Sequence, residues 1–208
     1  MNAQLVEHPV VFNALHHLRN KDTDSAKFRH YCHLITVPLI LEATKGLPLA
    51  NNQTETPLEL TNTKTYAESP VWIPILRAGL GMLKIVLDLF PESPVGHIGL
   101  ERDESTAIPR SYYEKLPPCD GQPVILLDPM LATGGSAANA IDLIKKSYPT
   151  SPVSLACIVA APEGIELLNE KHADVQIFTT SIDRQLNNIK YILPGLGDFG
   201  DRYFGTVG

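Results

Sequence analysis

The chain has 208 residues, of which 44% are hydrophobic and 19% charged, so it can bury a sizeable core and carries no composition typical of long disordered tails. Its formal net charge of −6 excludes a general nucleic-acid binder, which needs a basic face to neutralise phosphates. The three widely spaced cysteines predict no disulfide framework, as is usual in a reducing compartment. We recognise no signal peptide and no run of about 18 apolar residues, so we expect a cytoplasmic protein without a membrane span.

Regular elements are predicted along most of the chain. A helix is expected around residues 26–44, and residues 46–70, rich in Asn, Thr and Pro, are expected to form a loop or a small hairpin that projects as an arm. Short runs that are apolar throughout then predict buried parallel strands at 71–76, 95–100, 124–127, 153–160 and 175–179. Helical spacing of apolar residues predicts helices at 81–90, 136–146 and 165–171, and prolines predict a loop at 109–121.

Buried strands that alternate with helices predict an α/β fold, a mainly parallel sheet with helices on both faces. We expect residues 1–208 to form one domain, whose last part, 181–208, lines a pocket. Because ligands of such folds bind beyond the carboxyl ends of the strands, the residues that follow each apolar run are the candidates for function.

The most informative run ends at Asp128 and is followed by a loop that opens a helix with Thr133, Gly134, Gly135 and Ser136. The glycines let a ligand approach the backbone, the amides at a helix N-terminus bind anions, and Ser136 is the expected N-cap. Asp128 can accept hydrogen bonds from ribose hydroxyls, so the pattern suits a sugar phosphate, although a plain strand, Gly-rich turn and helix would also fit it. The loop lacks the lysine of a P-loop and the spacing of a dinucleotide fingerprint.

This stretch resembles the loop that binds phosphoribosyl pyrophosphate (PRPP) in the uracil phosphoribosyltransferases, members of the type I phosphoribosyltransferase superfamily. The resemblance implies that superfamily's fold, with a small hood or arm beside the sheet. It also implies that PRPP is bound by the whole stretch, which consists of Asp128, Pro129, Met130, Leu131, Ala132, Thr133, Gly134, Gly135 and Ser136. Most of the superfamily has a second acidic residue where Pro129 stands.

Two arginines follow two other apolar runs. Arg77 comes directly after the run 71–76 and is followed by Gly79 and Gly81, which suits a residue that holds phosphate oxygens, although an arginine at a sheet edge is also common. The surrounding sequence resembles the pyrophosphate loop of the same family, which implies that Arg77 binds the pyrophosphate of PRPP. Arg102 stands where the family has an arginine that contacts PRPP, and Glu101 replaces the aromatic residue often found before it.

A glycine-rich segment near the C-terminus contains Gly195, Gly197 and Gly200 at the spacing of a dinucleotide fingerprint. Pro194 and the eight residues left after Gly200 exclude that motif, which needs a helix and a second strand. The segment can instead line a pocket that reads a flat base, or merely cap the fold. It resembles the uracil-binding end of the same family, which implies that uracil is bound by Ile192, Gly197, Asp198 and Phe199, with Asp198 also facing PRPP. The family usually has Ala where Phe199 stands.

The resemblance covers nearly the whole chain and implies the reaction of uracil with PRPP to give UMP and pyrophosphate, with Arg77, Arg102, Asp128 and Asp198 as catalytic residues. It implies Mg²⁺ carried by PRPP rather than by a protein ligand set, a homodimer or larger homo-oligomer, and in some members a response to GTP. Two alternatives stay open: transfer to another base, which Phe199 suggests, and a non-catalytic regulator that binds PRPP. The sequence identifies no general base for the uracil N1 proton.

Overall fold

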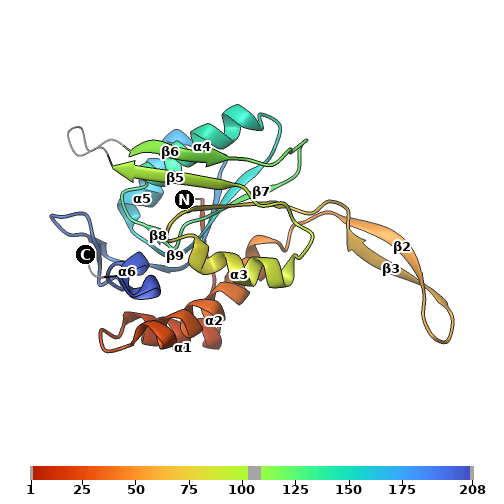
Figure 1. Ribbon diagram of the computed structural model, residues 1–208, viewed down its shortest axis with the longest axis horizontal. Coiled ribbons are helices and arrows are strands. Elements are labelled where there is room, and N and C mark those ends of the chain that lie inside the picture. The colour runs from red at the N-terminus through yellow and green to blue at the C-terminus, as the bar shows by residue number, and fades with distance from the viewer. Residues whose placement is uncertain (1, 103–108, 207–208) are drawn as a thin grey trace.

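The computed structural model describes residues 2–102 and 109–206, with the side chains of residues 101–111 outside that description (Figure 1). A central sheet runs through the molecule in the order β1 (Ala3–Leu5), β10 (Gln176–Ile182), β9 (Val153–Ala160), β7 (Val124–Leu127), β4 (Val71–Leu76), β5 (His97–Arg102) and β6 (Pro109–Lys115). The neighbours pair in parallel except β5 and β6, and the short β8 (Met130–Leu131) also pairs in parallel with β9. The predicted mainly parallel α/β fold is confirmed.

The central strands have the bounds that their apolar runs predict, because both of their faces are covered. Every residue of β7 is buried, and so is nearly every residue of β4 and β9. The prediction of a loop over 109–121 was wrong, since β6 occupies its first half and pairs antiparallel with β5 at the sheet edge. Tyr112 and Tyr113 of β6 are 53% and 44% exposed, and such an edge strand carries no continuous apolar run for sequence reasoning to find.

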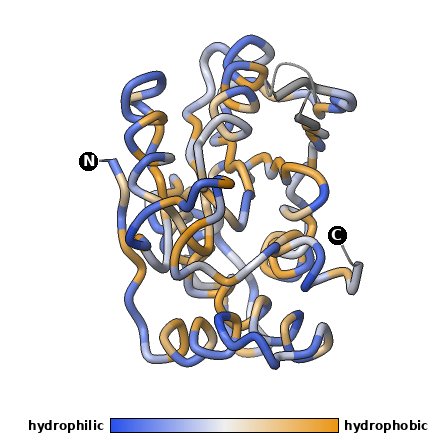
Figure 2. Tube along the Cα trace, turned by 90° about the vertical axis from the view of Figure 1, so that its left-hand side faces the viewer, coloured by the Kyte–Doolittle hydropathy of each residue, from blue (hydrophilic) through white to orange (hydrophobic). Residues whose placement is uncertain are grey.

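Helices cover both faces of the sheet (Figure 1). One core cluster includes residues of α1 (Pro9–Arg19), α2 (Ser25–Ala43) and α3 (Leu80–Leu89), and the other includes residues of α4 (Gly135–Ser147) and α5 (Pro162–Lys171). Figure 2 shows hydrophobic residues in the interior and, alternating with hydrophilic ones, along the helices. The sequence analysis missed α1 and the short α6 (Phe199–Phe204). Within the described ranges, no helix is long and apolar enough to cross a membrane.

Two antiparallel hairpins lie outside the central sheet. Strands β2 (Leu49–Glu55) and β3 (Leu60–Tyr66) pair along their whole length and extend away from the body of the molecule (Figure 1). Most of their side chains are exposed, so the hairpin forms no part of the core. The shorter pair, β11 (Gln185–Leu186) and β12 (Ile192–Leu193), leads into the glycine-rich C-terminal segment.

The strand order reverses between β4 and β7. From β4 the chain moves outward through α3 to β5 and β6, then returns to place β7 on the other side of β4 and continues outward to β9 and β10. A parallel sheet opens a crevice at such a reversal, beyond the carboxyl ends of its strands. Arg77 follows β4 and Asp128 follows β7, so the topology places these two candidate residues on either side of that crevice.

Candidate active site

The loop after β7 is held on the sheet by its own backbone. The Pro129 carbonyl accepts hydrogen bonds from the amides of Ile158 and Val159, both at 3.0 Å, and the Leu131 carbonyl accepts one from Ala161 at 2.8 Å. These bonds extend the pairing of β8 with β9 and fix the path of the loop into α4. Its position therefore depends little on its side chains.

The first turn of α4 begins one residue earlier than predicted. Gly134, not Ser136, is the N-cap, in the left-handed conformation at φ +79°. A side chain there would also be excluded by space, because a Cβ on Gly134 would lie 2.8 Å from the carbonyl oxygen of Gly164. The amide of Gly135 donates to the Thr133 hydroxyl at 3.4 Å. This arrangement leaves the side chain of Ser136 available to a ligand in place of its predicted capping role.

A small cavity of about 120 Å³, here called the phosphate pocket, lies over this turn. It is lined by Asp128, Met130, Leu131, Ala132, Thr133, Gly134, Ser136, Ala137 and Lys190. The predicted PRPP-binding residues thus form most of its wall, with the exception of Pro129 and Gly135. Helix N-terminal amides and two hydroxyls converge there, a combination suited to a phosphate group.

Asp128 stands at the edge of the phosphate pocket, and burial raises the pKa of its carboxyl to about 7, against a weak opposing hydrogen bond from the Met130 amide at 3.5 Å. Loss of hydration disfavours the charged form of the carboxyl. A cation or ligand hydroxyls bound beside it would stabilise the carboxylate and lower its pKa again. An acceptor with this pKa titrates within the physiological range.

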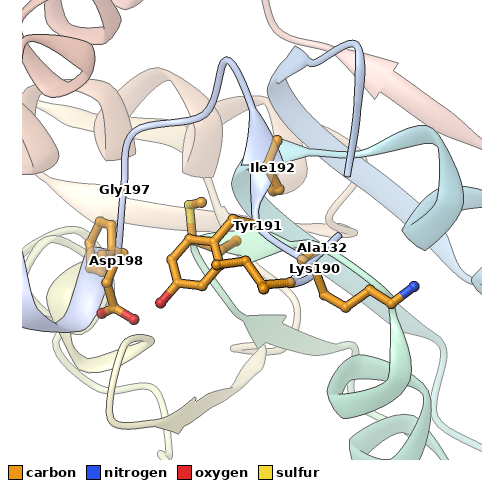
Figure 3. Close-up of a pocket in the computed structure, with 9 residues that line it drawn as sticks. Ala132, Lys190, Tyr191, Ile192, Gly197 and Asp198 are labelled. Carbon is orange, nitrogen blue, oxygen red and sulfur yellow. The ribbon is translucent and has the colours of Figure 1, made fainter. Parts of the chain in front are cut away.

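A second cavity of about 250 Å³, here called the base pocket, adjoins the phosphate pocket and shares Met130, Ala132 and Lys190 with it. Its wall is completed by Ile189, Tyr191, Ile192, Gly197, Asp198 and Phe199, so all four residues predicted to bind uracil lie together. Figure 3 shows the ring of Tyr191 extending across the pocket, with its hydroxyl directed toward the carboxylate of Asp198. Tyr191 and Lys190 were missed by the sequence analysis; the only sequence signal was their place directly before Ile192.

Phe199 lines the base pocket with little of its surface, since only 2% of the residue is exposed. Its ring lies 5.3 Å from that of Phe28 and 5.6 Å from that of Tyr203, within the core between α2 and α6. Gly81 provides the space, because a Cβ there would lie 2.9 Å from the Phe199 ring. The larger residue is thus accommodated in the core and leaves the base pocket open.

Asp198 is the N-cap of α6 and accepts a hydrogen bond from the Asp201 amide at 2.9 Å. The same helix is anchored by Arg202, whose guanidinium donates to the carbonyls of Leu196 at 2.7 Å and Asn20 at 2.6 Å, and also to that of Leu18. The C-terminal segment is therefore fastened to the end of α1, far away in the sequence.

A partly buried ion pair holds the other end of this segment. The guanidinium of Arg19 donates to both carboxylate oxygens of Asp183, at 2.8 and 2.6 Å, and to the carbonyl of Gly195 at 2.9 Å. Asp183 also accepts from the Ser181 hydroxyl and the Gly195 amide, both at 2.8 Å. Burial alone would raise the pKa of Asp183, but these hydrogen bonds outweigh it and lower the pKa below its ordinary value. Sequence reasoning missed Arg19, because nothing local links it to Asp183.

One of the two predicted pyrophosphate residues, Arg77, stands apart from both pockets. Arg77 follows β4, its guanidinium lies 3.7 Å from Asp201 and 5.9 Å from the centre of the Phe204 ring, and 60% of its side chain is exposed. It lines neither pocket and lies over α6 instead. Arg102 ends β5, and its side chain, like that of Glu101, lies outside the described residues. No group of three His, Cys, Asp or Glu side chains suited to a metal occurs among the described residues.

Solved structures of known proteins resemble this chain over most of its length. The adenine phosphoribosyltransferase of Trypanosoma brucei superimposes with a TM-score of 0.61 at 11% identity, covering 91% of this chain and 87% of its own, which establishes the type I phosphoribosyltransferase fold. The AQ2163 protein of Aquifex aeolicus superimposes with a TM-score of 0.92 at 36% identity and covers 98% of each chain.

The family model described as uracil phosphoribosyltransferase matches residues 5–206. A curated uracil phosphoribosyltransferase of Levilactobacillus brevis is 46% identical over 205 residues, 98% of each chain. The chain therefore belongs to the uracil phosphoribosyltransferase family.

Proposed function

We propose that the protein transfers the phosphoribosyl group of PRPP to uracil, giving UMP and pyrophosphate. The observation that carries the proposal is the pair of adjoining pockets that share Met130, Ala132 and Lys190. The product has a phosphate at one end and a base at the other, joined by ribose. The order of the two pockets matches the order of these groups, and Asp128 stands at the edge where ribose would lie.

Each part of the site has a role in the proposed reaction. The turn from Thr133 to Ser136 anchors the 5′-phosphate, and Asp128 orients the ribose hydroxyls. Arg77 and Arg102 stabilise the charge that develops on pyrophosphate as its bond to the anomeric carbon breaks. For Arg77 this requires exchanging its contact with Asp201 for the substrate, which its exposure permits. Holding both reactants in line supplies much of the rate.

Recognition of the base follows from the walls of the base pocket. Uracil presents alternating acceptors and donors on one edge, and the backbone around Gly197 and Ile192 offers amides and carbonyls to match it. A base with the wrong pattern leaves buried groups unpaired, which discriminates strongly. Asp198 is proposed to face both uracil and the ribose of PRPP, in keeping with its place in the pocket wall.

Mg²⁺ is proposed to enter with PRPP. The residues present fit this arrangement, because Mg²⁺ keeps several waters and is usually held by substrate phosphates plus one or two carboxylates, which Asp128 and Asp198 can provide. When bound, the ion would neutralise negative charge on the pyrophosphate. No dedicated protein cage is needed for it.

Assembly and location are further parts of the proposal. A homodimer or larger homo-oligomer is supported by the projecting hairpin, whose Leu58 is 94% and Leu60 63% exposed. A reducing, cytoplasmic setting is supported by the three cysteines, all of which are free. A response to GTP stays a prediction, to be tested by adding GTP to the assay.

A panel of bases tests the substrate. Purified protein is incubated with PRPP, Mg²⁺ and one of uracil, cytosine, orotate or adenine, and the nucleotide formed is measured. We expect turnover with uracil and at least 100-fold less with cytosine, which reverses one donor and one acceptor of the edge. Equal or greater turnover with another base would overturn the choice of uracil. Binding of PRPP without turnover of any base would favour the regulator.

A further inference from the structure

The phosphate pocket contains a cationic side chain that the family resemblance does not predict. Apart from Asp128, Lys190 is the charged residue that lines this pocket, whose other walls are neutral. A 5′-phosphate is a dianion at neutral pH, and Asp128 beside it is negative when ionised. Backbone amides and hydroxyls provide only partial charges there, so a full positive charge would contribute substantially to binding.

The loop that carries Lys190 is well ordered by hydrogen bonds. Asn187 accepts three backbone hydrogen bonds from this loop. Its side-chain oxygen accepts from the amides of Ile189 at 3.0 Å and Tyr191 at 2.9 Å, and its backbone carbonyl accepts from the backbone amide of Lys190 at 2.9 Å. The Leu186 amide before the loop donates to Glu163 at 2.9 Å and ties it to α5. Lys190 is therefore held at a fixed place over the pocket.

Lys190 occupies a backbone position that suits glycine better. Its φ of +67° lies in the left-handed region, and it is the one non-glycine residue in that region within the described ranges. In the same ranges the Lys190 ammonium has no carboxylate within 4 Å. Its charged neighbour is Glu163 of α5, beyond that distance, whose pKa it helps to lower. Figure 3 shows the Lys190 side chain directed away from Asp198, on the other side of Tyr191. The group is available to a ligand of the phosphate pocket.

We propose that Lys190 binds the 5′-phosphate of PRPP and of UMP, closing the phosphate pocket from the side opposite the turn of α4. This inference rests on the proposed function, since it takes the phosphate pocket as the site of that group. The proposed function assigns the pyrophosphate to Arg77, which follows β4, and to Arg102, which ends β5. Lys190 instead shares its pocket with Thr133, Gly134 and Ser136.

The test compares product inhibition in wild type, Lys190→Gly and Lys190→Arg. Glycine removes the charge and relaxes the left-handed backbone, so the loop keeps its shape, and arginine restores the charge. In Lys190→Gly we expect the inhibition constant of UMP and the KM for PRPP to rise about tenfold. This factor corresponds to the lower end of the range for a hydrogen bond to a charged group, as suits an exposed site. The inhibition constant of pyrophosphate, which lacks a 5′-phosphate, and the KM for uracil should change less than twofold. Lys190→Arg should recover most of the affinity for UMP.

Lys45→Gly, a lysine in a turn outside both pockets, is the matched control and should behave as wild type. Unchanged inhibition by UMP in Lys190→Gly would overturn the proposal, and so would an equal rise for UMP and pyrophosphate, which would place the charge on the wrong end of PRPP. A parallel rise in the KM for uracil would mean that the loop shapes the base pocket instead, and would also overturn it. Failure of wild type to form UMP would refute the proposed function itself.

Discussion

The two pockets of the site are built in different ways. Apart from Lys190, the phosphate pocket is made by a contiguous stretch of chain, residues 128–137, whose loop is fixed to β9 by backbone hydrogen bonds from Ile158, Val159 and Ala161. The base pocket is made by the C-terminal segment, which is fastened to α1 by the side chains of Arg19 and Arg202. A backbone-built site tolerates side-chain changes in its support, whereas a side-chain-built site depends on a few residues far away in the sequence.

This difference also decided what could be predicted from the sequence. The apolar runs of β4, β7 and β9 gave their strands and the parallel sheet, and the phosphate turn was predicted because its residues are consecutive. The glycine-rich segment suggested a pocket wall, but the individual base-pocket residues from Ile192 to Phe199 were assigned only through the family resemblance. The Arg19–Asp183 pair, 164 positions apart, has no local pattern, and neither has the edge strand β6.

The largest effect is expected in the phosphate pocket, at Asp128. Asp128→Asn removes the charged acceptor for the ribose hydroxyls, and two charge-assisted hydrogen bonds predict a fall of about 1000-fold in kcat/KM for PRPP, or about 4 kcal/mol. Steady-state assays of UMP formation measure it. Asp120→Asn, at an exposed loop position, is the control and should keep wild-type activity. A loss below tenfold would show that Asp128 does not hold the ribose.

The next largest effect is expected on stability, at a residue of the C-terminal segment that packs in the core and contributes little to uracil binding. Phe199→Ala should lower the free energy of unfolding by about 3 kcal/mol, because it leaves a cavity between Phe28 and Tyr203. The KM for uracil should change less than threefold, since the ring is in the core. Urea unfolding and uracil titrations check the two parts. The control Phe12→Ala removes a ring that is 54% exposed and should cost less than 1 kcal/mol.

A smaller effect tests the support of the base pocket directly. Arg19→Met leaves Asp183 buried without its partner, and we expect a loss of about 2 kcal/mol of unfolding free energy, below the range for fully buried pairs because the Arg19 side chain is 25% exposed. The KM for uracil should rise more than the KM for PRPP, since Gly195 loses an anchor. Arg184→Met, beside Asp183 but exposed, serves as the control. Equal changes in both KM values would contradict the separate construction of the two pockets.

The smallest effect is a pH dependence that belongs to the phosphate pocket alone. The pKa of Asp128 is about 7, and its ionised form is the acceptor, so kcat/KM for PRPP should rise about tenfold from pH 6 to pH 8. Asp128→Asn should lose this rise, while titration of PRPP itself affects both proteins alike.

The same group sets an opposite trend in stability. The folded-state pKa of Asp128 lies above the unfolded value of 3.8, so protonation favours the folded protein, and this stabilisation is lost as the pH rises from about 4 through about 7. Relative to Asp128→Asn, the wild type should therefore become less stable over the interval in which it becomes more active. Urea unfolding of both proteins at pH 5 and pH 8 measures the difference. If the unfolding free energies of the two proteins changed equally between pH 5 and pH 8, the carboxyl of Asp128 would be better hydrated than its position indicates. The pH dependence of activity would then be due to another group.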